Sequence, residues 1–478
     1  MASRSRVSLE LKNKRVLVIG LAKSGVAASL FLHERGALVV AADAKPEGEL
    51  GNAIAPLKSQ GIAIRSGELQ PQVENVDLIV VSPGVPADSP MLQQARARAI
   101  PVIGEVELAA QFLQGRIVAI TGSNGKTTTT ALTGDVLRKG GKDVLVGGNI
   151  GTPAVSLIPN SNPNSFVVLE VSSFQLETIQ TFDPSVAVVL NVTPDHLDRH
   201  GSMEAYVAAK ARIFENQTSS DFAVLNYDDP SCRGMATGLN RVSGPALFWF
   251  SRLHVVERGA CVRGNHVIWR DRKVEDEIIP IADIPLKGGH NLENVLAAVS
   301  AAVLSGCEPE SIARGVREFK AVEHRLEYVA TIRGIEYFND SKATNVDATI
   351  KALESFPANI HLILGGKDKG SDYTVLKPLL AERVKRVYTI GAAADKIESH
   401  IRGSVDVVRA GTMAEALRLA TAKAEPGDVV LLAPACASFD QFQNYEHRGR
   451  VFKELVRSLA QRHSAGSKDK REPHEAAS

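Results

Sequence analysis

IVAITGSNGKTTTT, residues 117–130, is the stretch that decides the fold of this chain. Apolar residues run into a turn with two glycines, and a lysine followed by hydroxyl residues then begins a segment of helical character. Glycines let backbone N–H groups approach phosphate oxygens, and the N-terminus of the next helix adds partial positive charge. Lys126 is placed to reach the outer phosphates of a nucleotide, and the Thr127 hydroxyl to ligate Mg²⁺. The stretch therefore predicts that the chain binds a nucleoside triphosphate.

This loop departs from the general pattern G-x-x-x-x-G-K-[ST] at one position. Ile120 stands where the first glycine is expected, and the first glycine comes only at Gly122. A chance Gly-Lys-Thr on a strand-to-helix turn is the ordinary alternative, but the ordered series of strand, glycines, lysine, hydroxyls and helix disfavours it. The departure argues against a generic P-loop switch or motor protein and favours a variant class.

Length and composition limit the class of protein. At roughly 150 residues a domain, 478 residues predict about three domains. The formal net charge of +1 provides no bulk attraction to nucleic acid or an anionic membrane. We see no apolar run of the roughly 18 residues that a membrane helix needs, and no apolar segment of a secretory signal at the N-terminus. The four cysteines are scattered without a C-x-x-C pair, which fits reduced thiols in the cytoplasm.

Strands alternate with helices along most of the chain, which predicts parallel sheets and the α/β fold class. We expect a Rossmann-like N-terminal domain (1–114), a central ATP-binding domain of P-loop type (115–320) and a Rossmann-like C-terminal domain (321–463). Shorter strands and turns are expected at 240–285. Residues 464–478 are polar, charged and without periodicity, so we expect a disordered tail.

The first domain carries a weaker nucleotide signal. Its loop GLAKSG (20–25) has alanine where the middle glycine of G-x-G-x-x-G would stand, which makes it a poor dinucleotide fingerprint. Asp43 ends the second strand, near the place where Rossmann folds hold a ribose. Together with the turn Ser82-Pro83-Gly84, this pattern favours a loop near the pyrophosphate of some nucleotide.

Polar residues end the two strands expected beside the phosphate-loop strand. Glu170 interrupts an apolar strand, and Asp195-His196 follow the strand that begins at Val186. A carboxylate and an imidazole at these ends can hold a metal ion directly or through water. Metal binding is the favoured interpretation for Glu170, because an unpaired buried carboxylate is costly. For Asp195, capping of the next helix is an equally good interpretation.

Lys210 lies on the hydrophobic face of an expected helix. Its neighbours at three and four positions are all apolar or aromatic: Tyr206, Val207, Ile213 and Phe214. Burial lowers the pKa of a lysine and exposes a neutral amine, which can take up CO₂ and become a metal-binding carbamate. The pattern alone favours the ordinary alternative, a lysine that extends to solvent from under an apolar cover.

The third domain contains three polar clusters at turns: EHR (323–325), NDSKATN (339–345) and GGKDKGSD (365–372). Cationic and hydroxyl groups at turns suit a substrate that carries a carboxylate or a phosphate. Ser438 follows a later strand of this domain. Cys436 lies close to it in the sequence, and packing is a better interpretation for this cysteine than nucleophilic catalysis, because no base is evident nearby.

Taken together, the motifs resemble those of the Mur ligases, the ATP-dependent amide ligases of peptidoglycan synthesis. The resemblance covers about residues 14–460. Within the family, NDSKATN and PACASFDQF favour a member that adds D-glutamate. The motifs are TGSNGKTTT (121–129), GGNIGTP (147–153), LEVSSFQLE (169–177), NVTPDHLDRH (191–200), HNLENVLAA (290–298), EHRLE (323–327), NDSKATN (339–345) and PACASFDQF (434–442).

The resemblance implies a cytoplasmic, monomeric ligase that uses ATP and Mg²⁺. Its substrates would be UDP-N-acetylmuramoyl-L-alanine and D-glutamate, with no nucleic acid and no membrane insertion. ATP would phosphorylate the substrate carboxylate, the amine of D-glutamate would attack the acyl phosphate, and a tetrahedral intermediate would collapse to amide and phosphate. Metal ions and cations would stabilise the charge that develops on the transferring oxygens.

The resemblance also implies roles for single residues. Those implied in catalysis are Lys126, Lys210, His196 and Lys342. Those implied in ATP binding are Gly122, Ser123, Asn124, Gly125, Lys126, Thr127, Thr128, Asn294, Arg325 and Asp340. Those implied at the metal ions are Thr127, Glu170, His196 and a carbamylated Lys210. Those implied in substrate binding are Ser24, Asp43, Ser82 and Gly84 at the UDP end, Asn149 and Ser172 for substrate or metal-bound water, and Lys369, Ser438 and Tyr445 for D-glutamate.

Several alternatives stay open. Lys369 is assigned by spacing alone, and Lys367 is the other candidate. A sibling Mur ligase that adds another amino acid is the nearest rival, although the D-N-P-R signature of the diaminopimelate- or lysine-adding ligase is absent. A folylpolyglutamate synthase would lack the first nucleotide-like domain. An NAD-dependent oxidoreductase would leave the triphosphate loop without a purpose, and a P-loop switch would hydrolyse ATP without an acceptor.

Overall fold

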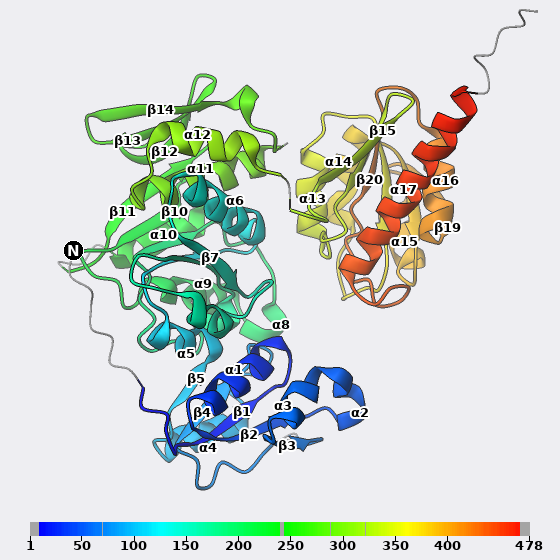
Figure 1. The fold of residues 1–478 in the computed structure, drawn as a ribbon. Helices are drawn as coiled ribbons and strands as arrows, with labels where there is room; N and C mark the ends of the chain where they lie inside the picture. Colours follow the sequence, from blue (N-terminus) through cyan, green and yellow to red (C-terminus); the bar gives the residue numbers. More distant parts are fainter. Residues whose placement is uncertain (1–8, 69, 240–242, 287, 321, 469–478) are drawn as a thin grey trace, which may run out of the picture. The chain divides into compact units, whose positions relative to one another are not determined.

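The computed structural model describes residues 9–68, 70–239, 243–286, 288–320 and 322–468. They form three β-sheets of five, nine and six strands (Figure 1). By its contacts the chain divides into two compact units, one of residues 1–285 and 293–319, the other of residues 286–292 and 320–478. The first two sheets belong to the first unit and the third sheet to the second. The predicted α/β class, with three sheet-based parts, is confirmed.

The N-terminal sheet is entirely parallel, with the strand order β3-β2-β1-β4-β5. This is the order of a Rossmann half, which places the carboxyl ends of β1, β2 and β4 at one edge. Its strands are β1 (Arg15–Ile19), β2 (Leu38–Asp43), β3 (Ala63–Ser66), β4 (Leu78–Val81) and β5 (Val102–Gly104). Its helices are α1 (Lys23–Glu34), α2 (Glu47–Leu50), η1 (Gly51–Ile54), α3 (Ala55–Ser59), α4 (Pro90–Ala97) and α5 (Glu105–Phe112).

The central sheet has the order β14-β13-β12-β11-β10-β9-β6-β8-β7 and is parallel from β12 to β7. The shorter strands and turns expected at 240–285 include β12 to β14, which the structure pairs as antiparallel hairpins. The strands are β6 (Arg116–Thr121), β7 (Val144–Gly148), β8 (Phe166–Glu170), β9 (Val186–Val189), β10 (Phe222–Asn226), β11 (Ala246–Ser251), β12 (Arg258–Arg263), β13 (His266–Asp271) and β14 (Val274–Pro280).

Strand β6 lies between β8 and β9, so the phosphate loop, Glu170 and the segment after β9 leave the sheet at the same edge. Helices connect these strands and continue the chain to Glu318. They are α6 (Lys126–Lys139), η2 (Ala154–Asn160), α7 (Ser173–Leu176), α8 (Leu197–His200), α9 (Met203–Ala211), η3 (Arg212–Phe214), α10 (Pro230–Leu239), η4 (Ile281–Asp283), α11 (Gly289–Leu304) and α12 (Pro309–Glu318).

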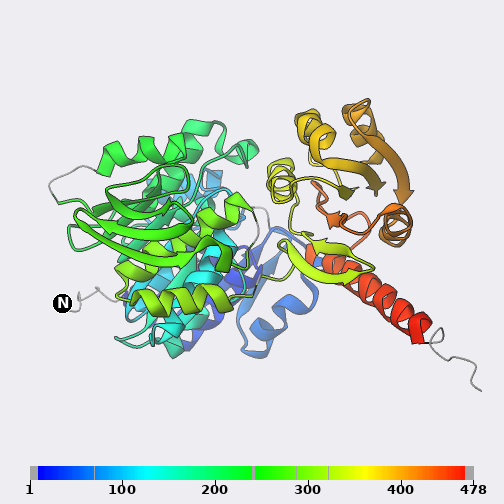
Figure 2. The same ribbon diagram turned by 90° about the horizontal axis from the view of Figure 1, so that it is seen from above.

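The C-terminal sheet has the order β15-β16-β20-β17-β18-β19, with β15 antiparallel at one side. Its strands are β15 (Glu327–Ile332), β16 (Ile335–Asn339), β17 (Ile360–Gly365), β18 (Val384–Ile390), β19 (Asp406–Gly411) and β20 (Val429–Leu432). Its helices are α13 (Val346–Glu354), η5 (Thr374–Leu376), α14 (Lys377–Arg383), α15 (Ala394–Ile401), α16 (Met413–Lys423) and α17 (Tyr445–Lys468). Helix α17 runs beside β15, β16 and α16 (Figures 1 and 2).

The tail differs from the prediction in its first residues. Helix α17 continues to Lys468, whereas the sequence predicts irregular structure from residue 464. A helix that is already formed extends one residue at a time, because each added residue gains a hydrogen bond without a new nucleation step. The rest of the tail, residues 469–478, lies outside the described residues.

Two buried glutamates at the start of α5 join it to loops of the central sheet. Glu105 Oε1 accepts the Val155 N–H at 2.8 Å, just after the GGNIGTP motif. Glu107 accepts the backbone N–H groups of residues 180–182, each at 2.9 Å. Burial raises the pKa of Glu105 to about 7, although the N–H groups that it accepts favour its charged form. These contacts fix the ends of two central loops to α5.

Within the described ranges, no helix is both long and apolar enough to cross a bilayer. All four cysteines are buried free thiols. Burial raises the pKa of Cys436 to about 11, which supports the predicted packing role over a nucleophilic one.

Candidate active site

The phosphate loop connects β6 to α6 and depends on glycine at its last position. Gly125 has φ +84°, and a Cβ at this position would lie 2.2 Å from Asn294 Oδ1 of α11. Asn294 also accepts the Thr129 hydroxyl at 3.2 Å. The structure thus brings Asn294 beside the phosphate loop, and only glycine allows both this approach and this backbone conformation.

Lys126 turns back over the loop that precedes it. Its Nζ donates to the carbonyl oxygens of Gly122 at 2.8 Å and Ser123 at 2.9 Å. These bonds hold the ammonium group beside the loop, at the N-terminus of α6, which contributes further positive charge. The arrangement is that of a phosphate-binding loop with its cation in place.

Asn191 is a residue of this site that the sequence pattern did not single out. Its side chain accepts the Asn124 N–H at 2.9 Å and donates to Asn124 O at 3.2 Å. Its backbone oxygen accepts the Ser123 N–H at 2.9 Å. The Ser123 hydroxyl also lies 3.1 Å from the Tyr206 hydroxyl. Asn191 opens the NVTPDHLDRH motif, so its place in the sequence was the signal that could have found it.

Glu170 is the last residue of β8, and its carboxylate accepts hydrogen bonds from two other predicted site residues. Its Oε2 accepts the Thr127 hydroxyl at 2.8 Å, and its Oε1 accepts the Asn149 side-chain amide at 3.0 Å. The side chain is buried, and both of these donors are neutral. A buried carboxylate held by neutral donors is well suited to a cation. The carboxylate, hydroxyl and amide oxygens offered here are ligands that fit Mg²⁺.

Lys210 does not extend to solvent, so the interpretation that the sequence pattern favoured is wrong. Only 1% of the residue is exposed. Its Nζ donates to Gly122 O at 2.9 Å and lies 4.4 Å from the centroid of the Tyr206 ring. Burial, and next the charge of Lys126, hold the pKa of Lys210 well below its ordinary value. A helix face packed on the phosphate loop leaves this side chain no path to water.

His196 and Ser172 lie at the N-termini of short helices after β9 and β8. His196 precedes α8 with φ 53°, and its half-exposed ring packs edge-on against Phe174 at 4.9 Å between centroids. Its Nε2 is 3.5 Å from an Asp195 carboxylate oxygen. Ser172 caps α7 in a reciprocal capping box with Gln175. His196 follows the end of β9 by a loop, and among the described residues no hydrogen bond or ion pair joins it to Glu170.

The residues predicted at the UDP end gather at one edge of the N-terminal sheet. Asp43 accepts the Leu21 N–H at 2.6 Å, so the end of β2 holds the glycine loop. The Ser82 hydroxyl donates to Gly20 O at 2.6 Å. Ser24 lies in the first turn of α1, and Gly84 lies in the turn after β4, where an added Cβ would have open space.

Arg199 of α8 is a second residue that the sequence pattern did not single out. Its guanidinium donates to Pro83 O at 3.2 Å and to Val85 O at 3.0 Å. It also forms an ion pair with Glu177 at 2.8 Å and lies over the Phe174 ring. Arg199 therefore connects the motif that contains His196 to the turn that contains Ser82 and Gly84.

In the C-terminal sheet, the turns at 323–327 and 339–345 bring three predicted residues together. The Leu326 N–H donates to Asp340 Oδ1 at 3.3 Å, and the Lys342 N–H donates to His324 O at 3.1 Å. Lys342 Nζ lies 3.7 Å from the centroid of the Tyr445 ring. Burial raises the pKa of Asp340 to about 7, an effect that the charge of Arg325 opposes. Two cations and a carboxylate therefore lie close together at these turns.

The two loops predicted to bind D-glutamate are paired through their backbones. Lys367 and Ala437 form an isolated antiparallel bridge, with N–H···O distances of 2.8 and 3.1 Å. Lys369 is exposed in the first loop, and Ser438 is buried in the second. The bridge brings the two loops side by side, and the choice between Lys367 and Lys369 stays a prediction.

Three family profiles match the chain along its length. The N-terminal domain of MurD-like Mur ligases matches residues 14–104, the Mur ligase middle domain matches 120–302, and the glutamate ligase domain of Mur ligases matches 324–436.

Curated relatives match nearly the whole chain. A UDP-N-acetylmuramoylalanine–D-glutamate ligase of Koribacter versatilis is 60% identical over 95% of this chain and 99% of its own. Enzymes with the same name from Acidobacterium capsulatum and Solibacter usitatus are 56% and 50% identical, and the matches cover 96% and 94% of this chain and 98% and 99% of theirs.

Solved structures show the same fold at low sequence identity. A MurF ligase of Thermotoga maritima in complex with ADP has a TM-score of 0.60 at 17% identity, covering 94% of this chain and 97% of its own. A UDP-N-acetylmuramate–alanine ligase of the same organism has a TM-score of 0.57 at 19% identity, covering 94% of this chain and 100% of its own.

Proposed function

The chain belongs to the Mur ligase family and is an ATP-dependent ligase that adds D-glutamate to UDP-N-acetylmuramoyl-L-alanine, and on this premise we propose how its residues divide the work. The observation that carries the proposal is the convergence of Lys126 and Lys210 on Gly122 O, beside the bonded pair Thr127 and Glu170. Two amines and a buried carboxylate at one phosphate loop suit transfer of a phosphoryl group to an acceptor.

The reaction has two steps. The γ-phosphoryl group of ATP passes to the carboxylate of the L-alanyl residue, which gives an acyl phosphate and ADP. The amine of D-glutamate then attacks the acyl carbon and loses a proton, and the C–O bond to phosphate breaks as the amide forms. Negative charge grows on the transferring oxygens in both steps, so fixed cations and N–H groups around them lower the barrier.

The phosphate loop would bind the triphosphate. Residues 122–128 offer backbone N–H groups and hydroxyls to its oxygens, and Lys126 would move from the loop carbonyls to the outer phosphates. Asn294 holds the loop from α11, and Asn191 holds it from the end of β9. A loop that is already in its binding conformation needs less ordering when ATP binds.

Glu170, Thr127, His196 and a modified Lys210 are the residues that we propose to hold Mg²⁺. Bound Mg²⁺ would neutralise charge on the transferring phosphoryl oxygens. Asn149 bonds Glu170 and orients its carboxylate. Asn149 and Ser172 would contact the substrate or water bound to the metal.

Lys210 is proposed to act as a carbamate. Its neutral amine would add to CO₂ and release one proton, so a buried cation would become an anion at the phosphate loop. The low pKa of Lys210 supports this step, because only the neutral amine is nucleophilic. The new carboxylate would attract the Lys126 ammonium instead of competing with it for Gly122 O.

The other two domains would supply the substrates. Ser24, Asp43, Ser82 and Gly84 would face the UDP end, where the β1–α1 loop and the β4 turn meet. Arg325 and Asp340 would contact ATP, and Lys342 would lie near the reacting phosphoryl group. The residues proposed to position D-glutamate are Lys369, Ser438 and Tyr445.

Phosphate release from ATP, measured with UDP-N-acetylmuramoyl-L-alanine and single amino acids in turn, tests the proposal. We expect release that depends on both substrates and on Mg²⁺, with D-glutamate preferred over its L-enantiomer and over other amino acids. Release in the absence of an amino acid would contradict it. A monomer in the cytoplasm, where ATP is available, is the proposed working state, and sedimentation checks the oligomeric state.

A further inference from the structure

One stripe of helix α17 contacts two polar turns of the C-terminal sheet. Tyr445, Gly449 and Lys453 are spaced four residues apart, so they lie on one face of the helix. The Tyr445 ring lies under the Lys342 ammonium and 6.3 Å edge-on from the His324 ring. The helix thus reaches the turns at 323–327 and 339–345 from one side.

Gly449 allows the closest approach on this stripe. A Cβ at Gly449 would lie 2.2 Å from His324 Nδ1, and both residues are buried. The Gly449 carbonyl oxygen accepts the Asn339 side-chain amide at 3.4 Å. The same amide lies 2.9 Å from His324 Nδ1. The histidine ring is therefore enclosed between the helix backbone and Asn339.

Lys453 supplies the charge on this stripe. Its Nζ donates to Glu323 Oε1 and to Glu327 Oε1, the latter at 2.9 Å, and only 7% of the residue is exposed. Burial disfavours its charge, but the two carboxylates outweigh burial and raise the pKa of Lys453. The Lys453 ammonium is almost out of reach of water, so it depends on these two carboxylates for its partners, whereas Glu323 itself is exposed.

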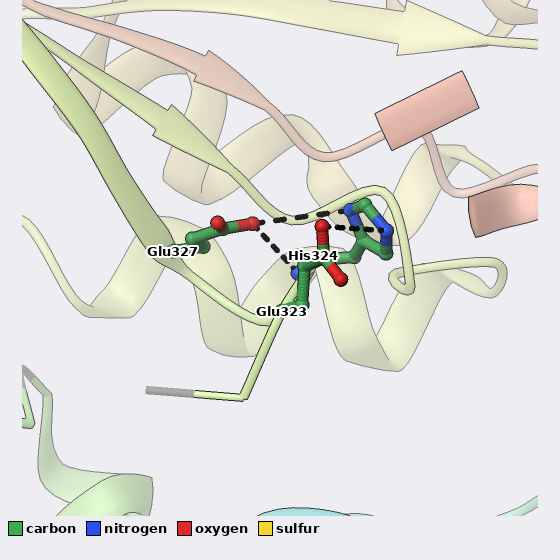
Figure 3. A group of neighbouring side chains, drawn as sticks. All are labelled: Glu323, His324 and Glu327. Carbon is green, nitrogen blue, oxygen red and sulfur yellow. Dashed lines mark hydrogen bonds and ion pairs between the residues drawn. The ribbon is translucent and has the colours of Figure 1, made fainter. Parts of the chain in front are cut away.

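Glu323, His324 and Glu327 have ligand atoms within 4.8 Å of one another, as a metal site requires (Figure 3). The Lys453 ammonium, however, already bonds both carboxylates. Glu327 Oε2 also accepts the backbone N–H of His324 at 2.9 Å and the side-chain amide of Asn339 at 3.1 Å. Glu323 and Glu327 are therefore already paired with a cation of the chain itself, Lys453, and together with His324 they form a network of charged and polar side chains.

The turn that this network holds has an unusual backbone. His324 and Leu326 have φ values of 67° and 41°, a region that side chains other than glycine rarely adopt. Such residues persist only where the surroundings impose the conformation, and they concentrate at functional sites. Arg325 lies between them, so the direction of its side chain depends on both strained residues.

We propose that Lys453 is a positioning residue for nucleotide binding, acting through Glu323 and Glu327 to hold the strained turn that presents Arg325. This inference rests on the proposed role of Arg325 in contacting ATP. The same turn donates the Leu326 N–H to Asp340 and accepts the Lys342 N–H, so its displacement would also move those two residues. Lys453 itself would touch neither substrate nor nucleotide.

The experiment compares the K453M, K453R and E323Q variants with R457M. Arg457 is an exposed cation one turn further along α17, so R457M removes a charge from the same helix outside the network. Steady-state kinetics give kcat and the KM of each substrate, and titration with a non-hydrolysable ATP analogue gives a nucleotide Kd. We expect K453M to raise the KM and Kd for nucleotide by on the order of tenfold, since small misplacements at a binding site have effects of at least this size.

The KM for the UDP substrate should stay within about twofold of the wild-type value, because that substrate is not proposed to meet this turn. K453R should recover most of the nucleotide affinity. E323Q should weaken the nucleotide affinity several-fold. E323Q added to K453M should have little further effect, because coupled residues are not additive. R457M should match the wild-type protein in every parameter.

Equal nucleotide Kd values for K453M and R457M would overturn the proposal, as would an equal rise in the KM of all three substrates. Should K453M fail to fold, E323Q decides, and an unchanged nucleotide Kd in E323Q would overturn the proposal. Failure of the wild-type protein to release phosphate with D-glutamate would instead contradict the proposed function, because the nucleotide titration does not depend on turnover.

Discussion

Lys126 and Lys210 donate to the same backbone oxygen, the carbonyl of Gly122, at 2.8 and 2.9 Å. The two residues come from different helices, α6 and α9, and Lys210 is almost fully buried. Two ammonium groups at one acceptor repel each other, and this repulsion adds to burial in lowering the pKa of Lys210. The arrangement therefore favours a neutral amine at Lys210.

Replacement of Lys210 tests the carbamate. We expect K210A and K210R to lose activity by on the order of a hundredfold or more, because arginine keeps a charge but cannot form a carbamate. Short carboxylic acids should restore part of the activity of K210A and none of that of K210R. Labelled bicarbonate should give a carbamate signal by NMR in the wild-type protein, and its absence there would contradict the proposal.

Replacement of Glu170 tests the metal site. E170Q keeps the size of the side chain and one of its two acceptor oxygens but removes the charge. Mutation of the residues that orient a metal's ligands typically costs roughly 10- to 100-fold in metal affinity or activity. We therefore expect the Mg²⁺ concentration for half-maximal activity to rise by at least this much. E215Q, at an exposed carboxylate paired with Arg212, is the control. An unaltered Mg²⁺ dependence in E170Q would remove Glu170 from the metal site.

The last glycine of the phosphate loop should not tolerate a side chain. In G125A the new Cβ would meet Asn294 Oδ1 at 2.2 Å, and alanine would have to adopt φ +84°. We expect a cost of about 1–3 kcal/mol from the backbone conformation, together with loss of nucleotide binding as the loop moves. G48A is the control, because Gly48 has open space and no positive φ. Calorimetric titration with ATP measures both variants, and wild-type affinity in G125A would refute the prediction.

Glu105 should make stability depend on pH. The unfolded chain releases this proton near pH 4.5, whereas the folded chain keeps it to about pH 7. Unfolding therefore releases a proton between these values, so the free energy of unfolding falls as the pH rises through this window and is constant above it. The shift corresponds to about 3 kcal/mol.

The E105Q variant cannot lose that proton and keeps an acceptor for the Val155 N–H. Its Tm should match the wild-type Tm near pH 4.5 and exceed it well above pH 7, where the folded wild-type protein carries a buried charge. E310Q, at an exposed glutamate in the first turn of α12, should show no such divergence. A gap between E105Q and the wild-type protein that does not grow with pH would show that Glu105 is charged in the folded state.

The sequence predicts which residues of the central sheet lie together, because its motifs stand at the ends of parallel strands. Thr127, Glu170 and Asn149 come from three segments, and β6, β7 and β8 bring them to one edge, where they form direct bonds. The order of parallel strands is enough to predict such neighbours. The roles of these residues in catalysis stay predictions that the variants above test.

What the sequence could not predict depends on packing between segments that lie far apart in the chain. The apolar face around Lys210 is visible in the sequence, but whether its amine reaches water depends on what covers that face. Asn191 and Arg199 lie in a recognised motif, but the motif does not show which backbone atoms they bond. Lys453 lies in an ordinary amphipathic helix, and only the fold shows that its partners are Glu323 and Glu327.

The acceptor shared by Lys126 and Lys210 is a main-chain atom, and this has a consequence for inhibition. A mutation at position 122 cannot remove the carbonyl oxygen; it can only displace it, because an added Cβ would lie 2.9 Å from Leu190 Cβ. An inhibitor that donates a hydrogen bond to this oxygen would bind a feature that no single substitution can delete. Escape would require a change in the path of the loop, and the phosphate site would be lost with it.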